Sequence, residues 1–505
     1  MTSLWKSDRH PPEASVPSEP GAHHDVVIVG AGITGLVTGV MLAREGRDVA
    51  ILESGGIAQL ASGANTGKVS LLQGSVLSTL RRHHPASLVR AYVDANRAGM
   101  EWLRAFADEA GVPTTTQTAY SYVQGRAGLY LVDAEVAAAR EAGLSVRRVD
   151  PADIPAPPFP LAGAAALEGQ LAIDPVRLAD ALARAFVAAG GVLHTGVRVR
   201  KVRVLPRPRV LTDAVEVAAG RIILATGTPI DDRGLYFAKT QGLRSSCVAF
   251  ETDAEIPPGM FLSIDDPSRS VRAVSAADGP AGPARLIVGG NGHPVGRAES
   301  ERALIDDLVA WTREHFPDAR ETHRWWAQDY ESHNLVPFVG GMPRSLGRVR
   351  FATGYGKWGL TNGPAAALRL ADDIRGTRWR DRPRFTQRLS TRLTVPSDIA
   401  RGLAENARVG RAALTRWAGA QAHAVPVARP PEGEGVVANR AGMPVAISTV
   451  NGHTRAVGAI CPHLGGVLEW NDAACTWDCP LHASRFTAEG VRIEGPATSD
   501  LKPIR

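Results

Sequence analysis

The distribution of apolar positions near the start of the chain predicts a strand, a tight turn, a helix and a second strand. A β-branched run at 25–29 leads directly into a glycine-rich turn. A helix-like stretch then continues to Arg44, and a further apolar run at 48–52 ends at Glu53. Short apolar runs separated by a helical stretch are typical of parallel strands. This order predicts an α/β fold for the N-terminal part.

Further along the chain, the pattern predicts a mixture of helices and strands and then short strands alone. No internal repeat is evident, and no run of eighteen apolar residues predicts a membrane-spanning helix. The fold class expected is α/β, or α+β overall, with a small antiparallel all-β domain at the end. Helices are expected at 88–110, 304–316 and 396–417, and strands at 286–290, 435–437 and 445–447.

Composition and cysteine usage add bounds on domain number and compartment. The 505 residues are 44% hydrophobic and 21% charged, which suits a globular chain of two or three domains. The Pro- and Ser-rich segment 1–24 lacks the apolar core of a signal peptide and is expected to be disordered. Four cysteines, two of them assigned below to a metal centre, leave no disulfide framework and favour the cytoplasm.

The net charge of +6 comes mostly from arginines spread along the chain. The densest basic run, 375–392, has two interpretations: a solvated linker face, or a docking surface for an acidic electron-carrier protein. Basic and aromatic residues are not interleaved as in nucleic-acid-binding modules, so no nucleic-acid partner is expected.

The first glycine-rich turn has the spacing of a dinucleotide-binding motif. Gly30-Ala-Gly32-Ile33-Thr34-Gly35 lies between the first strand and the helix, and Glu53 follows eighteen residues after the last glycine. Glycines let the backbone approach a pyrophosphate, the helix N-terminus stabilises its charge, and the acid accepts hydrogen bonds from a ribose. The alternative is a tight turn without a ligand.

Near the C-terminus, two cysteines and two histidines are paired as C-x-H and C-x-x-H. Cys461 and His463 are separated from Cys479 and His482 by fifteen residues. Two thiolates on one iron and two imidazoles on the other can hold a [2Fe–2S] cluster. Zinc is the alternative for two cysteines and two histidines, although a zinc finger spaces its histidines differently.

The segments CPHLGG, TWDCPLHASRF and EGPATSDL around these ligands resemble the Rieske ferredoxin domain over about 430–505. The resemblance implies that the Ser484 hydroxyl donates a hydrogen bond to the cluster. The respiratory branch has an additional disulfide, but Gly466 and Leu481 stand at those cysteine positions here. This difference predicts a reduction potential toward the low end of the Rieske range, which spans roughly −150 to +300 mV.

The loop after Glu53, Ser62-Gly-Ala-Asn65-Thr66-Gly-Lys68, resembles that of the D-amino-acid oxidase-like FAD oxidoreductases. The resemblance covers about 25–376. The sequence Gly-Leu-Tyr-Phe-Ala-Lys at 234–239, and Trp-x-Ala-Gln-Asp-Tyr ending at Tyr330, are typical of members that carry a Rieske domain. The resemblance implies FAD and, besides the turn and Glu53, these cofactor-binding residues: Ser54, Ser62, Asn65, Thr66, Lys68, Val199, Ala225, Thr226, Gly227, Gly354, Trp358, Gly359, Leu360 and Thr361.

The same resemblance implies the domain order. A Rossmann-like FAD subdomain is expected at about 25–75, 169–235 and 345–376, interleaved with a mixed-sheet substrate subdomain at about 76–168 and 236–344. A helical linker at 377–427 and the Rieske domain at 428–505 follow.

Three side chains are the candidates for chemistry beside the flavin. Lys68 could stabilise anionic reduced flavin, and its alternative role is a phosphate or surface contact. Trp358 and Tyr355 could wall the flavin, and their alternative role is packing. Gln73 stands where many members have histidine, so no histidine role is expected there.

These features predict a dehydrogenase that oxidises a small substrate, by resemblance an amine or amino-acid derivative. Hydride would pass to FAD, and electrons would pass singly through the cluster to a small carrier protein. Two alternatives reverse the flow, from a carrier through the cluster to flavin, or make the chain a non-catalytic redox sensor or docking protein. An NAD(P)H-dependent ferredoxin reductase would need a second nucleotide-binding motif after a strand, and only one is found.

Overall fold

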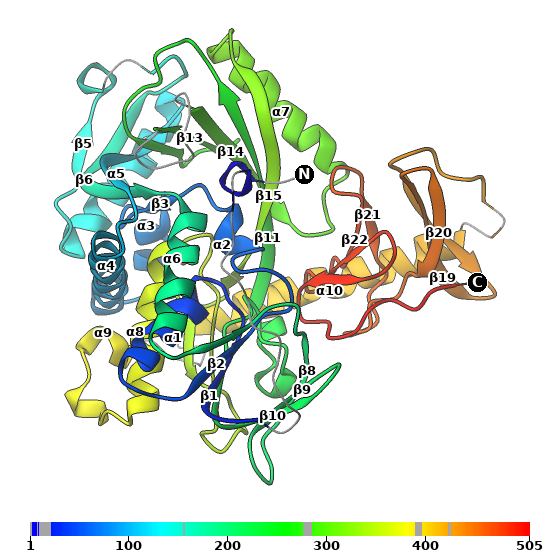
Figure 1. Ribbon diagram of the computed structural model, residues 1–505. Helices are drawn as coiled ribbons and strands as arrows, with labels where there is room; N and C mark the ends of the chain where they lie inside the picture. Colours follow the sequence, from blue (N-terminus) through cyan, green and yellow to red (C-terminus); the bar gives the residue numbers. More distant parts are fainter. Residues whose placement is uncertain are drawn as a thin grey trace.

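The computed structural model describes residues 3–7, 9, 22–154, 157–275, 285–388, 396–422, 425 and 427–504. Two sheets with their helices form the larger part of the molecule, and an all-β lobe projects from one side (Figure 1). The expected fold class, mixed α/β with a final antiparallel β domain, is confirmed.

The first sheet contains the dinucleotide turn. Its order is β16 (Phe338–Gly341), β17 (Val349–Thr353), β10 (Glu216–Leu224), β1 (His23–Val29), β2 (Val49–Leu52) and β7 (Val192–His194). All neighbours from β17 to β7 pair in parallel, while β16 is antiparallel. A hairpin of β8 (Val199–Arg203) and β9 (Arg209–Thr212) joins through β10.

The side chains of alternate residues of β1 point to opposite faces of this sheet. Val26 and Ile28 pack into the core shared with α1 (Ile33–Arg44), α6 (Pro175–Ala188) and α8 (Gly359–Arg375). Val27 and Val29 pack on the opposite face with the β8–β9 hairpin. A strand buried on both faces explains why 25–29 is continuously apolar.

The second sheet has nine strands and provides the other wall of the site. Its order is β15 (Arg320–Ser332), β11 (Thr240–Glu251), β14 (Arg285–Pro294), β13 (Arg269–Val274), β12 (Met260–Ser263), β4 (Thr114–Val123), β6 (Gly163–Ile173) and β3 (Lys68–Val69), with β5 (Arg147–Val149) on β6. The helices α5 (Leu129–Glu141) and α7 (Glu301–His315) pack on this sheet, and α3 (Val76–His83) packs beside α5. The helix α4 (Ala86–Glu109) packs against α8 of the first sheet.

Two strands pair in the sheet of the other subdomain than the one in which they were expected. The strand β3, expected in the FAD subdomain, pairs with β6 and belongs to the second sheet. The strand β16, expected in the substrate subdomain, is the antiparallel partner of β17 in the first sheet. Both strands are assigned by their antiparallel pairing with a partner strand. The apolar pattern of such short strands does not reveal which partner they pair with.

The linker and the final domain follow the expected order. The linker contains α9 (Arg384–Arg388) and the long helix α10 (Pro396–Ala422), which extends toward the β lobe in Figure 1. The lobe has a sheet of β18 (Gly435–Arg440), β19 (Met443–Val450) and β20 (His453–Gly458). A second sheet contains β21 (Glu469–Asn471), β22 (Thr476–Asp478), β23 (Arg485–Thr487) and β24 (Arg492–Glu494). No helix in the described ranges is long and apolar enough to cross a membrane.

The expectation of a disordered tail at 1–24 is wrong for residues 3–7, and also for His23 and His24, which begin β1. A short 3-10 helix, Leu4–Lys6, buries Leu4 and Trp5 against the second sheet. The Trp5 indole nitrogen donates to the Asn65 carbonyl at 2.7 Å. Two large apolar side chains anchor this segment despite its polar surroundings, while 10–21 lie outside the described residues.

The basic run 375–392 is partly neutralised by carboxylates of the same chain. Arg375 pairs with Glu45 and, at 3.0 Å, with Asp372, and Arg382 pairs with Asp373. These pairs favour the linker interpretation, because paired arginines present less charge to an acidic partner. Residues 389–395 lie outside the described part.

Candidate functional site

The turn between β1 and α1 can be formed only by glycines at two positions. Gly30 has a φ of +108°, and a Cβ atom there would lie 2.5 Å from the Ala225 carbonyl oxygen. A Cβ on Gly35 would lie 2.0 Å from the Gly30 oxygen. The two glycines let α1 begin close against β1 and β10, so the N-terminus of α1 faces the site.

The acid predicted to bind ribose stands at the end of β2 and is held by its surroundings. The carboxylate of Glu53 accepts hydrogen bonds from the backbone amides of Ala31 and Gly55, each at 2.8 Å, and from the Ser54 hydroxyl at 3.1 Å. Two fixed backbone donors orient the carboxylate, which is half-buried and lines the cavity described below. Its remaining lone pairs can accept from a ribose.

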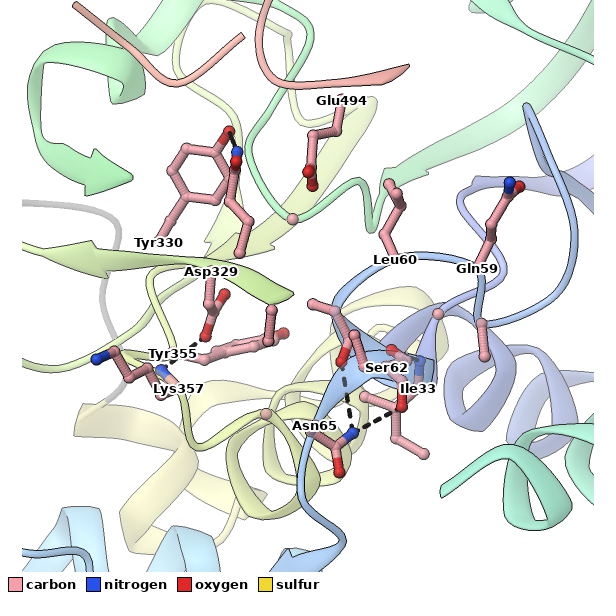
Figure 2. A pocket seen from close by; sticks show the side chains of 18 of the residues that line it. Ile33, Gln59, Leu60, Ser62, Asn65, Asp329, Tyr330, Tyr355, Lys357 and Glu494 are labelled. Carbon is pink, nitrogen blue, oxygen red and sulfur yellow. Dashed lines mark hydrogen bonds between the residues drawn. The ribbon is translucent and has the colours of Figure 1, made fainter. Parts of the chain in front are cut away.

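The segment 61–67, which begins with the short helix α2 (Ala61–Ala64), lies beside the start of α1 (Figure 2). The Ser62 hydroxyl accepts from the Ile33 amide at 3.0 Å, and the Asn65 side chain donates to the Ser62 carbonyl at 2.6 Å. The Gly67 amide donates to the Asn65 side-chain oxygen at 2.8 Å. This network places 62–66 beside the helix N-terminus, where an anionic ligand would be stabilised.

A cavity of about 330 Å³ lies between the two sheets, beside this turn. Most of the predicted cofactor-binding residues line it. Gly35, Gly354 and Thr361 do not, because they support the wall from behind. Those in the lining are Gly30, Gly32, Ile33, Thr34, Glu53, Ser54, Ser62, Asn65, Thr66, Lys68, Val199, Ala225, Thr226, Gly227, Trp358, Gly359 and Leu360, together with Tyr355.

The three remaining positions have structural contacts. Gly354 has a φ of +86°, and a Cβ there would lie 2.8 Å from the Ser332 Cβ. Thr361 accepts from the Gln73 side-chain amide at 3.0 Å. Gly35 packs against the turn itself.

Two loops of the β lobe bring the four predicted metal ligands together. The ring centroids of His463 and His482 are 5.2 Å apart, and both histidines are half-buried, whereas Cys461 and Cys479 are buried. Hydrogen bonds from the Cys479 thiol and the Ser484 hydroxyl lower the pKa of the Cys461 thiol to about 7. The thiols are therefore neighbours, as ligands of one iron must be.

Backbone hydrogen bonds close each ligand loop. The Cys461 amide donates to the Gly466 carbonyl at 2.8 Å, and the Cys479 amide donates to the Ser484 carbonyl at 2.8 Å. Within the described chain, no three His, Cys, Asp or Glu residues surround one point as ligands of a single ion. A two-iron cluster requires only two protein ligands on each iron, so this donor set fits it.

Comparison with known sequences identifies the larger part of the chain. A model of the FAD dependent oxidoreductase family matches residues 25–373. The chain belongs to this family. A model of the Rieske [2Fe-2S] domain matches residues 422–505. FAD and a [2Fe–2S] cluster are therefore the cofactors of this Rieske oxidoreductase, and the zinc alternative is set aside.

Related proteins agree with this assignment. The Rieske 2Fe-2S iron-sulfur protein YhfW of Bacillus subtilis is 27% identical over 99% of this chain and 97% of its own length. Glycine oxidase from Geobacillus kaustophilus has a TM-score of 0.61 and 19% identity, covering 74% of this chain and 100% of that chain. L-amino acid deaminase from Proteus vulgaris has a TM-score of 0.62 and 15% identity, covering 76% of this chain and 99% of that chain. These two structures share the fold of the oxidoreductase part.

Two lysines line the FAD cavity: Lys68, which is half-buried, and Lys357, whose side chain is exposed toward the cavity. The Lys68 ammonium donates to the Phe261 carbonyl and the Ser270 hydroxyl, each at 2.7 Å. Burial and the nearby Arg272 lower the pKa of Lys68 to about 7. Desolvation by the cavity walls also lowers the pKa of Lys357. An anionic ligand in the cavity would be a counterion for these lysines and would favour their charged forms.

Sequence reasoning gave no role to Lys357, although it lies within the predicted flavin loop. Its Nζ atom would lie 2.3 Å from a Cβ built on Gly292, so it covers the second sheet at a position that only glycine leaves open. Its backbone amide donates to Asp329 at 2.7 Å (Figure 2). Burial raises the pKa of Asp329 to about 6. The signal available was a lysine inside a glycine-rich segment, Gly354-Tyr-Gly-Lys-Trp-Gly.

The other flavin-side candidates are fixed by their neighbours. The Tyr355 hydroxyl is 2.8 Å from the Thr34 hydroxyl at the start of α1, and Trp358 precedes α8. Of the residues in the Tyr-Phe-Ala-Lys segment, Tyr236 is buried, whereas Phe237 contacts both histidine ligands, with centroid distances of 4.8 Å to His463 and 4.9 Å to His482.

The Rieske domain packs directly on the oxidoreductase domain beside its cluster. The side-chain amide of Gln328 donates to the Ala483 carbonyl at 2.9 Å, and Arg297 donates to the Pro480 carbonyl at 3.1 Å. A Cβ on Gly242 would lie 2.2 Å from the Ala483 Cβ, so this contact requires glycine. The cluster loop 479–483 therefore fits closely against β11 and β15.

Proposed function

We propose that this protein is a dehydrogenase that oxidises an amine or amino-acid derivative and passes the electrons through the Rieske cluster to a small carrier protein. Two observations support an amino acid. The cavity is lined by two lysines, of which Lys357 would bind a carboxylate, and the solved structures of like fold include an oxidase of glycine and a deaminase of L-amino acids.

The balance of the reaction explains the need for two redox centres. The substrate would lose a hydride from carbon and a proton from nitrogen, so that its C–N single bond becomes an imine. FAD supplies a two-electron acceptor for the hydride, and the cluster supplies one-electron steps, so two carrier molecules leave reduced for each substrate oxidised.

Lys68 has the position and the proton affinity to exchange a proton near neutral pH. Its Nζ atom lines the cavity, and a pKa of about 7 leaves an appreciable neutral fraction at physiological pH. Lys357 would remain the cation that orients the substrate. Asp329 would neutralise part of the charge when no substrate is present.

The observation that supports the relay is the position of β15 between the FAD cavity and the cluster loop. Gln328, Asp329 and Tyr330 all line the cavity, and the side chains of Gln328 and Tyr330 also reach the carbonyl of Ala483, at 2.9 and 3.5 Å. Ala483 directly follows the cluster ligand His482. One strand therefore contacts both cofactor sites, so the protein between the two redox centres is short.

None of the four cysteines forms a disulfide in the described chain, which supports a reducing compartment and thus the proposed cytoplasmic location. The proposal is tested by mixing the protein under nitrogen with a panel of amines and amino acids and following the visible flavin band. Bleaching by an amino acid, followed by reduction of an added one-electron carrier, is expected. Flavin that is bleached only by a reduced carrier would instead show the reverse direction of flow.

A further inference from the structure

The Rieske domain contributes to the wall of the FAD cavity. Its last strand and the following residue, 492–495, line the cavity together with residues of both sheets of the oxidoreductase part. Figure 2 shows Glu494 facing the cavity opposite Leu60 and Ser62. A domain that binds the second cofactor therefore borders the site of the first.

Arg492 in this segment is a buried cation without an acidic partner. The residue is 9% exposed, and within the described chain its side chain makes one hydrogen bond, from Nη2 to the Gly495 carbonyl at 2.5 Å. Its buried Nε has no acceptor, and no carboxylate in the described chain forms an ion pair with it. The nearby Glu494 instead binds Arg485 at 2.6 Å.

A buried guanidinium that lacks a carboxylate is costly unless an anion joins it. The neighbouring Arg198 adds a second positive charge beside Arg492. Its guanidinium donates to the Arg492 carbonyl at 2.7 Å, and Arg198 also lines the cavity. Burial, followed by repulsion from Arg198, lowers the pKa of Arg492 to about 10. Two arginines, Arg198 and Arg492, therefore lie beside the cavity, and no carboxylate in the described chain forms an ion pair with Arg492.

The position of Arg492 along the cavity indicates which part of the ligand it meets. On one side is Arg198, next to Val199 in the strand that leads from the Glu53 end. On the other side is Tyr330, whose hydroxyl interacts electrostatically with Arg492 and which borders the flavin end beside Asp329. A dinucleotide carries its two phosphates between the adenosine and the flavin.

We propose that Arg492 binds the diphosphate of FAD, so that the Rieske domain supplies part of the flavin site. The inference rests on FAD binding and is independent of the direction or existence of electron transfer. Arginine presents several donors in a planar fork that matches phosphate oxygens. By linkage, FAD binding and docking of the Rieske domain then strengthen each other.

The test compares FAD binding by R492Q and by R455Q in the full chain. Arg455 lies in the same domain on the exposed strand β20 and pairs with Glu489 at 3.0 Å, so it controls for loss of an arginine. Apoprotein is titrated with FAD while flavin fluorescence is followed, and cluster EPR of each variant reports the fold of the domain. We expect R492Q to raise the Kd for FAD about 10- to 100-fold and R455Q to leave it unchanged. A Kd for R492Q within about twofold of wild type would overturn the proposal.

A second measurement uses the wild-type chain and does not depend on the folding of a variant. Hydrogen exchange of the segment 485–500 is compared in apoprotein alone, with FAD and with ADP, which has the diphosphate but no flavin. Both nucleotides should slow exchange at 492–495. Unchanged exchange with both, at concentrations that occupy the site, would contradict the proposal. A substrate that fails to bleach the flavin would count against the proposed function and would leave both of these readouts unaffected.

Discussion

Gln328 on β15 donates a hydrogen bond to the main-chain carbonyl of Ala483 at 2.9 Å. This contact connects the oxidoreductase domain to the residue that follows a cluster ligand. The Tyr330 hydroxyl lies 3.5 Å from the same carbonyl and 3.3 Å from the Gln328 amide. Because the three groups are buried, the cluster loop is held by a small polar network that has little access to water.

Removing this network should change the cluster without changing flavin reduction. Q328A leaves a buried carbonyl without its donor and should weaken docking by about 1–3 kcal/mol. We expect slower electron transfer from flavin to cluster and an altered cluster EPR spectrum, with the rate of flavin bleaching by substrate unchanged. Q387A, in α9, is the matched control. A wild-type transfer rate and spectrum in Q328A would show that the contact does not position the cluster.

The two cofactors should be separable by one cysteine substitution. C479S should lose iron and the Rieske EPR signal but keep FAD, because the dinucleotide turn and Glu53 lie in another domain. Substrate should still bleach its flavin, and carrier reduction should stop. Cys475 lies between the two ligand pairs and is the matched control, so C475S should keep both cofactors. Loss of the cluster in C475S, or its retention in C479S, would contradict the ligand assignment.

Lys357 should determine affinity for an anionic substrate. K357M removes a cation that lines the cavity, so KM for a carboxylate substrate should rise about tenfold or more, while FAD binding and kcat change less. K357R keeps the charge and should recover part of the affinity. Steady-state kinetics with an amino acid and with the matching amine, which lacks the carboxylate, separate the two effects. Equal losses for both substrates would argue against a carboxylate contact.

Lys68 should make the stability of the protein depend on pH above neutrality. Burial and Arg272 lower its pKa to about 7 in the folded state, below the ordinary value of 10.5. Between these values the unfolded chain holds a proton that the folded protein has released, so stability rises with pH across this window and is flat below it.

K68M should remove this contribution and flatten the curve by up to about 1.4 kcal/mol per pH unit. Lys357 contributes with the same sign, so the comparison with wild type isolates Lys68. Urea unfolding of the holoprotein across the window measures the slope. K201M, at an exposed lysine of β8, should behave as wild type, and an unchanged slope in K68M would exclude a neutral Lys68.

The sequence was sufficient where a site is local in the chain. Gly30 and Glu53 belong to one strand–helix–strand unit, and each pair of cluster ligands lies within four residues, so spacing alone predicted both sites. Gly354 and Thr361 follow the family pattern equally well. The structure places them behind the cavity wall, where Gly354 packs on Ser332 and the Thr361 hydroxyl accepts a hydrogen bond from the Gln73 side-chain amide.

Residues that depend on the approach of distant segments could not be found in this way. Asp329 reaches the flavin cavity only because β15 pairs with β11 at the edge of the second sheet. Arg492 reaches it only because the Rieske domain docks there. Trp5 is anchored by a loop sixty residues away, which its polar neighbours in the sequence do not indicate. Tertiary contacts of this kind leave no periodicity in the sequence.

Single-turnover kinetics under nitrogen show whether electrons pass between flavin and cluster inside one chain. The holoprotein is mixed with less than one equivalent of a bleaching substrate, frozen at successive times and examined by EPR, while stopped-flow absorption follows the flavin. The reduced-cluster signal is expected to grow at the rate at which the flavin loses its first electron. Flavin that stays fully reduced while the cluster stays oxidised would contradict this expectation.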